Sequence, residues 1–433
     1  MRTIHLALLG LGTVGTGVAR ILREQARHLE SQSGARFAIR WVVVRDPSKP
    51  RGIELEDGIL TTEVDRAISD PEVDIVVELI GGIDPARDLI ARSLRAGKHV
   101  VTANKAVLAK HGRELFGVAN ASGRVIGFEA AVAGGIPIVA AVAQGLAANR
   151  ISSLAGILNG TSNYILTAMH QQGIGYDEAL AEAQRLGFAE ADPTLDVDGN
   201  DALQKLAILS RLAFQSRVPL EAIRRQGIDT LADVDLHFAS ELGYVIKLLA
   251  VAREVEGKLA LRVSPTLVAR NHPLGQVHNE YNAIKVTGHA IGDTIYLGKG
   301  AGMMPTASSV VADLLDVAIG RAQETFRSLK LWDESPPGPP VSDDGSMPNR
   351  FYLRYSIRDE PGTLARIAGI LGGHGISIAS VIQHETSEDD IGSAVPLIIM
   401  THIAREGAVR TALRETDALD IVRAPTVCLH VAD

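Results

Sequence analysis

The sequence predicts an α/β fold in three parts: a Rossmann-type parallel sheet, an α+β domain, and a C-terminal ferredoxin-like domain. Three observations predict it. A Gly-x-Gly-x-x-Gly motif follows an apolar run at the start of the chain, strand and helix patterns alternate through about residue 135, and a β-α-β-β-α-β pattern follows residue 350. The proline-rich segment 332–345 marks the clearest boundary between these parts.

Composition and charge exclude several classes of protein. The 433 residues suffice for two or three domains, and 46% apolar with 22% charged residues is typical of a globular protein. A net charge of −8 without a long basic run argues against nucleic-acid and membrane partners. The single cysteine, Cys428, excludes an internal disulfide, and no zinc-site spacing, signal peptide or long apolar run is found. We therefore expect a cytoplasmic protein.

The glycine motif predicts a dinucleotide site. Residues 4–9 form a short apolar strand, and a helical pattern follows the motif. The first glycine permits a tight turn, the second lets the backbone approach a pyrophosphate, and the third lets helix and strand pack closely. The helix N-terminus adds N–H groups and positive potential. The expected cofactor contacts are Gly10, Gly12, Thr13, Val14 and Gly15.

The end of the second strand, residues 37–44, bears on coenzyme choice. Arg45 and Lys49 stand where a ribose 2′-phosphate would need positive charge, which favours NADP. Asp46 leaves NAD as an alternative coenzyme, because a carboxylate at this position suits a ribose 2′-hydroxyl. Alternatively, these residues are solvated loop charges.

Further strands at 74–80, 99–105 and 124–131 alternate with helices at 84–96 and 105–121, which completes a first domain over residues 1–135. Ligands in such sheets lie beyond the carboxyl ends of the strands, where Lys105 falls. Lys105 could reach substrate or nicotinamide, or it could be an ordinary first-turn lysine.

The second domain is expected over residues 136–325. Its elements are a strand at 151–158, helices ending near 170 and 186, a helix at 202–214, a long helix at 236–253, and strands at 259–268, 282–289 and 294–298. A second glycine-rich turn, with Gly302, enters a helix at Pro305 and could cover the nicotinamide. The helix at 305–325 is expected to pack back on the first domain.

The helix at 202–214 is apolar nearly all round, which predicts burial. Asp201 and Lys205 nevertheless lie one turn apart on it, after an acid-rich stretch. Burying these charges is costly unless they meet partners or a ligand, so they indicate a polar site in an apolar wall. The alternative is an ordinary ion pair at a helix edge.

Together these motifs resemble the homoserine dehydrogenase family, in family order over residues 1 to about 325. The Glu190 to Lys205 cluster is the most specific match. The matching stretches are Gly10-Leu11-Gly12-Thr13-Val14-Gly15, Thr102-Ala103-Asn104-Lys105, residues 129–137, Leu158-Asn159-Gly160-Thr161-Ser162-Asn163-Tyr164, Glu190-Ala191-Asp192-Pro193 with Asp196, Asp201 and Lys205, and Gly300-Ala301-Gly302 before Pro305.

The resemblance implies reversible reduction of L-aspartate 4-semialdehyde to L-homoserine with NAD(P)H, in threonine, methionine and isoleucine biosynthesis. It implies that the second domain is catalytic and forms the dimer interface of a homodimer or homotetramer. Lys205 matches the proton donor, with Asp201 beside it, and Lys105 matches a lysine at the junction of substrate and cofactor. Groups that hold the substrate are Glu190, Asp196, Asp201 and Lys105, and a sodium site matches Glu129 with the carbonyls of Val132, Gly134 and Ile136.

A linker at 326–349 leads to residues 350–433, whose pattern resembles an ACT domain. The resemblance implies an amino-acid effector, L-threonine, bound near Asp359 and Gly362, where glycine lets the backbone approach a carboxylate. An oligomerisation module without a ligand is the alternative. Two rival functions remain: a non-catalytic amino-acid sensor with a nucleotide-binding fold, and another ACT-bearing dehydrogenase. The start of the glycine motif at residue 10 argues against phosphoglycerate dehydrogenase.

Overall fold

The computed structural model describes residues 1–329, 338–342, 347–384 and 394–432, so residues 330–337 and 343–346 of the predicted linker lie outside the described residues. The chain divides into two compact units. The first comprises Met1–Gly160, Asp201–Ile223 and Glu280–Pro340, and the second comprises Thr161–Asn200, Arg224–Asn279 and Val341–Asp433. The domain boundaries 1–135, 136–325, 326–349 and 350–433 stay a prediction.

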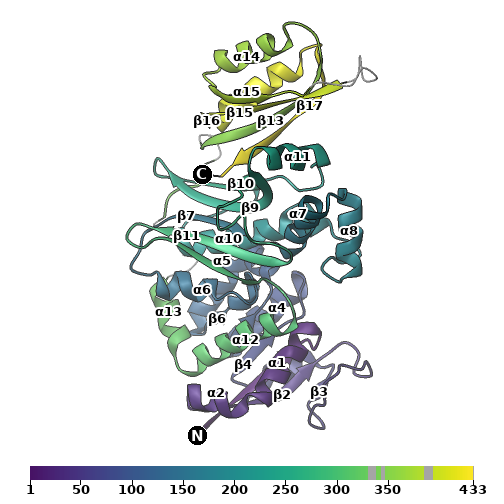
Figure 1. The fold of residues 1–433 in the computed structure, drawn as a ribbon. Helices are drawn as coiled ribbons and strands as arrows, with labels where there is room; N and C mark the ends of the chain where they lie inside the picture. Colours follow the sequence, from purple (N-terminus) through teal and green to yellow (C-terminus); the bar gives the residue numbers. More distant parts are fainter. Residues whose placement is uncertain (330–337, 343–346, 385–393, 433) are drawn as a thin grey trace. The chain divides into compact units, whose positions relative to one another are not determined.

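A six-stranded sheet lies in the first unit, and Figure 1 labels its strands β2, β3, β4 and β6. The strand order is β3-β2-β1-β4-β5-β6, with every pair parallel. The strand order reverses between β1 and β4, which is where a ligand lies in sheets of this kind. The predicted Rossmann-type sheet is confirmed. Its strands are β1 (Arg2–Leu9), β2 (Ala35–Val43), β3 (Leu60–Thr61), β4 (Ile75–Glu78), β5 (His99–Thr102) and β6 (Ile126–Gly127).

Helices pack against this sheet. One apolar cluster joins Ala7 and Leu9 of β1 to residues of α3 (Val64–Ser69) and α4 (Asp84–Arg95). The N-terminal helix α1 packs against α12, which also contacts β5 and β6. The remaining helices of this part are α1 (Thr13–Glu24), α2 (Ala26–Ser33), α5 (Lys105–Ser122), α6 (Ile138–Ala140), α12 (Met303–Ala318) and α13 (Arg321–Leu329), with short η1 (Glu129–Ala131), η2 (Ala141–Gly145) and η3 (Leu220–Ala222) turns.

The first unit also holds an antiparallel ladder, β12-β11-β7, and most of helix α10. Most residues of α10 are buried, including Asp201 and Lys205, so the predicted buried helix is confirmed. None of the described helices is by itself long and apolar enough to cross a membrane; α12 and α13 satisfy length and composition only as a pair, bent by 90°. The elements are β7 (Ile151–Ile157), α10 (Asn200–Phe214), β11 (Tyr281–Gly288) and β12 (Gly292–Lys299).

In the second unit, β9 and β10 form a long antiparallel pair, and β10 also pairs in parallel with β8 and β17. The buried carboxylate of Asp235 on α11 accepts hydrogen bonds from Nε of Arg354 at 2.6 Å and Nη2 at 3.0 Å, which ties α11 to β13. The elements before residue 340 are α7 (Gly160–Gln172), α8 (Tyr176–Arg185), α9 (Thr194–Val197), β8 (Arg224–Arg225), α11 (Asp233–Glu241), β9 (Tyr244–Val255) and β10 (Lys258–Ala269).

The C-terminal part has the predicted ferredoxin-like fold, with strand order β17-β13-β15-β14. Its core joins residues of both helices to the sheet. The elements are β13 (Pro348–Arg358), α14 (Thr363–Gly373), β14 (Ile378–Ile382), β15 (Ala394–Thr401), β16 (Ala404–Arg405), α15 (Glu406–Asp417) and β17 (Val422–Val431).

Three predicted elements are wrong. The helix at 305–325 is instead two helices, α12 and α13, bent by 90°, because Gly320, with φ +86°, follows the end of α12. The long helix at 236–253 is instead α11 followed by β9; Gly243, with φ +82°, ends the helix, and a run buried at successive positions shows no helical or strand period. The strand at 124–131 is only β6, because the chain turns into η1 at Glu129.

Candidate active site

Polar side chains join the carboxyl ends of β4 and β5. The fully buried Glu78 accepts a hydrogen bond from Oγ1 of Thr102 at 2.6 Å, and its other oxygen accepts from backbone N–H groups of the loop after β4. Asn104 donates from Nδ2 to the Gly82 carbonyl oxygen at 2.8 Å and caps α5 through its own carbonyl. This network fixes the first turn of α5, and with it Lys105.

Two lysines share one carboxylate in the first unit. Nζ of Lys205 donates to Oδ2 of Asp201 at 2.7 Å and to the Leu158 carbonyl oxygen at 2.8 Å. Nζ of Lys105 lies 3.0 Å from Oδ1 of the same carboxylate. Asn159 donates from Nδ2 to Oδ2 of Asp201 at 2.9 Å. The structure therefore brings together the three residues predicted to be catalytic.

Burial differs within this cluster. The side chains of Lys205 and Asp201 are 11% and 8% exposed, whereas that of Lys105 is 39% exposed. Burial opposes ionisation of Asp201, but the charges of Lys205 and Lys105 outweigh it and hold the pKa of the carboxyl well below its usual range. One anion between two cations leaves a net positive charge, which suits a reaction that develops negative charge on a substrate oxygen.

Arg211 ties the two helices that carry the lysines. From α10 its guanidinium donates to the backbone carbonyl of Ala109 on α5 at 2.8 Å and to that of Val218 at 2.6 Å. Burial lowers the pKa of Arg211 to about 10. The bond to Ala109 therefore links α10 to α5 through a backbone group, and the bond to Val218 holds the guanidinium from the segment after α10.

The glycine loop has the shape that a pyrophosphate needs. The backbone N–H groups of the first helical residues, Thr13, Val14 and Gly15, have no partner within the helix. A Cβ on Gly10 would lie 2.8 Å from the Leu79 carbonyl oxygen, and one on Gly15 would collide with the Gly10 carbonyl. A Cβ on Gly12 would meet nothing within 4 Å. The open side of the loop is thus at Gly12, where a dinucleotide would approach.

The loop after β2 leaves Arg45 and Lys49 exposed. Asp46 is turned into its own loop, because Oδ1 accepts from the backbone N–H of Ser48 at 2.9 Å and from its hydroxyl at 2.6 Å. These hydrogen bonds lower the pKa of Asp46.

The second glycine turn packs on the loop 132–136. A Cβ on Gly134 would lie 2.6 Å from the Gly300 carbonyl oxygen, and the Gly135 N–H donates to the Lys299 carbonyl at 3.0 Å. Gly302 has φ +124°, which favours glycine, and it caps α12.

The predicted sodium ligands are a carboxylate and backbone carbonyls of the first unit. The oxygens of Glu129 accept from the N–H groups of Val139 and Ala140, each at 2.8 Å. Burial raises the pKa of Glu129 to about 7 against these hydrogen bonds. The Gly134 carbonyl accepts from Oγ of Ser309 at 2.5 Å. Within the described ranges, no three His, Cys, Asp or Glu side chains gather as a metal site.

The other predicted substrate ligands lie in the second unit. Glu190 is exposed, in the segment before α9, and Asp196 is half-buried within α9. The Asp196 carbonyl oxygen accepts from Oγ of Ser162 at 2.8 Å, and rings of Tyr164 and Phe188 pack 4.8 Å apart.

The predicted effector residues lie on the loop between β13 and α14. Gly362 has φ +92° and precedes the first turn of α14, with open space where a Cβ would be. Oδ1 of Asp359 accepts from Nε2 of Gln383 at 3.1 Å.

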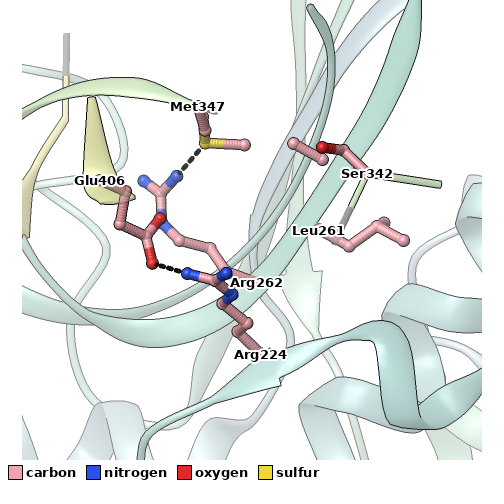
Figure 2. Close-up of a pocket in the computed structure, with 7 residues that line it drawn as sticks. Arg224, Leu261, Arg262, Ser342, Met347 and Glu406 are labelled. Carbon is pink, nitrogen blue, oxygen red and sulfur yellow. Dashed lines mark hydrogen bonds and ion pairs between the residues drawn. The ribbon is translucent and has the colours of Figure 1, made fainter. Parts of the chain in front are cut away.

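A separate pocket in the second unit lies where the C-terminal module meets β8 and β10 (Figure 2). Arg224 pairs with Glu406, and Arg262 donates to Sδ of Met347 at 2.9 Å. Burial opposes ionisation of Glu406, but His430 and Arg224 lower its pKa to about 2. The described residues that line this pocket include none of the predicted site residues.

Comparison with known proteins shows which families the parts of this chain resemble. A homoserine dehydrogenase family model matches residues 137–315, the NAD-binding domain model of the same family matches 10–129, and an ACT domain model matches 351–418. A homoserine dehydrogenase of Bacillus subtilis is 42% identical over 427 residues, which cover 98% of this chain and 97% of that protein.

The chain belongs to the homoserine dehydrogenase family. The structure of a homoserine dehydrogenase from Thiobacillus denitrificans is similar with a TM-score of 0.93 and 43% identity, covering 100% of this chain and 99% of that one. A hyperthermophilic archaeal homoserine dehydrogenase in complex with NADPH has a TM-score of 0.63 and 26% identity, over 73% of this chain and 98% of that one. This homoserine dehydrogenase is therefore an oxidoreductase with an NAD(P)-binding domain and a C-terminal ACT domain.

Several polar groups around the lysines were not predicted. The Leu158 carbonyl and the side chain of Asn159 were missed as partners of Lys205 and Asp201, and Glu78 was missed as the partner of Thr102. Glu78 lies in the strand predicted at 74–80, and Asn159 lies in a stretch that matches the family but was assigned no role. The available signal was a charged or polar residue at the carboxyl end of a buried strand, which is where sites form in α/β sheets.

Proposed function

We propose that this homoserine dehydrogenase reduces L-aspartate 4-semialdehyde with NADPH, with Lys205 as the donor that protonates the nascent alkoxide. The main support for this proposal is the buried Lys205 amine, which donates to the Asp201 carboxylate and the Leu158 carbonyl. A buried lysine is costly, so its retention beside a carboxylate favours a chemical role over an ordinary ion pair. The rate of NADPH oxidation with aspartate semialdehyde tests the activity directly.

The residues present fit this chemistry. When bound, the nicotinamide supplies the hydride to the aldehyde carbon. Lys205 gives a proton to the aldehyde oxygen as its negative charge develops, which avoids a free alkoxide. Asp201 holds the amine in place, and the more exposed Lys105 supplies a second positive charge for the substrate. Glu190 and Asp196 are proposed to bind the substrate's ammonium and hydroxyl groups, on the strength of the matching family motif.

The coenzyme is proposed to be NADP, with NAD less favoured. Arg45 and Lys49 are exposed at the end of β2, while Asp46 is engaged by Ser48 within its own loop. The archaeal relative's structure contains NADPH, which supports the same choice.

Arg45→Ala is expected to raise KM for NADPH by about 10-fold, or about 1.4 kcal/mol, and to leave KM for NADH unchanged, because only NADPH carries the 2′-phosphate. Steady-state assays with each coenzyme measure this. Arg36→Ala, an exposed arginine near the start of β2, is the control and should leave both constants unchanged. Equal effects of Arg45→Ala on both coenzymes would contradict the proposal.

A sodium ion is proposed to bind Glu129 and the carbonyls of Val132, Gly134 and Ile136. Hard oxygen ligands suit such a cation, and each carbonyl oxygen has a second lone pair beyond any hydrogen bond it accepts. Burial and the negative charge of Asp316 raise the pKa of Glu129, so a cation beside this carboxylate would be electrostatically favourable.

Activity is expected to fall when sodium is replaced by tetramethylammonium at constant ionic strength, and to recover on adding sodium. Glu129→Gln should show little response, because the carboxylate charge is missing. Activities of both enzymes across a sodium titration provide the measurement. An unchanged wild-type rate in sodium-free buffer rules out a functional sodium site.

The ACT domain is proposed to bind L-threonine as a feedback effector at Asp359 and Gly362. The loop that they form ends at the N-terminus of α14, and Gly362 leaves open space on its surface. N–H groups there can bind a carboxylate, and Asp359 can bind an ammonium group.

Calorimetric titration with L-threonine is expected to show binding at millimolar concentration or below. Asp359→Asn should weaken it by about 10-fold, or about 1.4 kcal/mol. Asp420→Asn, an exposed carboxylate of the same domain that pairs with Arg366, is the matched control. If the wild-type protein shows no heat of binding at millimolar threonine, the ACT domain is instead an oligomerisation module.

A further inference from the structure

Two consecutive residues at the end of β7 hold both members of the Lys205–Asp201 pair. The Leu158 carbonyl accepts from Lys205 at 2.8 Å, and Asn159 Nδ2 donates to Asp201 Oδ2 at 2.9 Å. Lys205 donates to the same carboxylate oxygen at 2.7 Å, while Oδ1 lies 3.0 Å from Lys105. Contacts at both oxygens therefore fix the orientation of the Asp201 carboxylate.

The segment that makes these contacts is itself fixed. β7 pairs with β11 up to Ile157, opposite Ala283. One residue beyond Asn159, a Cβ on Gly160 would lie 2.6 Å from the Glu280 carbonyl oxygen. Asn159 is 5% exposed, so its amide has little freedom to turn away. A shift of this strand end would displace the amine contact and the carboxylate contact together.

An amide has an advantage over a charged donor at this position. In the proposed reaction Lys205 alternates between ammonium and amine. When it is an amine, its Coulombic attraction to Asp201 is lost, whereas the attraction to Lys105 remains. The amide of Asn159 does not titrate, so its hydrogen bond to Oδ2 persists in both states. Without it, this oxygen would lose the one uncharged side-chain donor that the described hydrogen bonds give it.

We propose that Asn159 is a positioning residue for hydride and proton transfer: its amide keeps Oδ2 of Asp201 directed at Lys205 while the lysine loses and regains its proton. The inference rests on the role proposed for Lys205. Asn159 touches neither the substrate nor the cofactor in this role; it acts through Asp201.

Two substitutions test it. Asn159→Asp keeps the shape of the side chain but puts an acceptor in place of the donor, and Asn159→Ala removes the side chain. We expect Asn159→Asp to lower kcat by about 10-fold or more and Asn159→Ala by less, with KM for aspartate semialdehyde changed by less than about 3-fold. The solvent deuterium isotope effect on kcat should rise in both, because a misdirected lysine makes proton transfer slower.

Asn163→Ala is the matched control, since Asn163 is 1% exposed and donates to the backbone carbonyls of Val277 and Asn279. Per folded molecule it should keep the wild-type kcat and isotope effect. If both Asn159 variants behave like Asn163→Ala, the inference is overturned and Asn159 is purely structural. If Lys205 is not the proton donor, a different result follows: the Lys205→Ala variant keeps near wild-type turnover.

Discussion

Lys205→Ala is expected to lower kcat for aspartate semialdehyde reduction by at least about 100-fold, the usual scale of general-acid catalysis. The substitution removes the amine that Asp201 and the Leu158 carbonyl hold in place. The alkoxide would then form without a donor, and Asp201 would keep Lys105 as its lysine partner. Steady-state NADPH oxidation at saturating substrate measures the loss, and circular dichroism checks the fold.

A second buried lysine supplies the control. Lys247, on β9, is 3% exposed and donates to neutral groups, Oδ1 of Asn163 at 3.0 Å and the Val277 carbonyl at 2.6 Å. Burial lowers its pKa to about 8. Lys247→Ala should change stability, because it removes hydrogen bonds from buried acceptors, and leave kcat per folded molecule near wild type. Turnover of Lys205→Ala within a few-fold of wild type refutes its assignment as proton donor.

Gly12→Ala is expected to weaken NADPH binding by about 10-fold or more, or about 1.4 kcal/mol, without lowering the melting temperature. The added Cβ meets no protein atom within 4 Å, and the backbone φ of −82° suits alanine. In a dinucleotide-binding loop this is the position where the backbone approaches the pyrophosphate, so the methyl group would displace the ligand rather than the protein. Fluorescence titration with NADPH and thermal melts measure the two effects separately.

Gly15→Ala gives the contrasting result. Its Cβ would collide with the Gly10 carbonyl oxygen, so the loop or α1 must move. Such overpacking typically costs about 1–3 kcal/mol, and the free protein should melt at a lower temperature. If Gly12→Ala destabilises the protein as much as Gly15→Ala does, or leaves NADPH affinity unchanged, the pyrophosphate does not lie against Gly12.

The parts of the fold with a clear hydrophobic periodicity, or with glycine and proline residues at the ends of elements, could be predicted from the sequence. The parallel sheet follows from alternating strands and helices, and the ferredoxin-like module from its β-α-β-β-α-β order. The segment from residue 236 could not, because β9 is buried at every position from Val245 to Ala252 and such a run fits a buried helix equally well. There Gly243 marks the end of α11, but isolated glycines carry little weight within an apolar run.

The centre of the site was predictable for a different reason. Asp201 and Lys205 stand out because charge in an apolar helix is costly, and four residues of spacing place them on one face. Asn159 lies 42 residues from Asp201, and no local pattern distinguishes an asparagine that caps a helix from one that holds a distant carboxylate. Tertiary packing decides between these uses.

The contact between the loop 132–136 and the second glycine turn includes close approaches between main-chain groups. Gly134 faces the Gly300 carbonyl, and Gly135 donates to Lys299. Side chains absorb small displacements by changing rotamer, whereas touching peptide groups have no such slack. We therefore expect a displacement of one loop to displace the other, and with it the start of α12 at Met303.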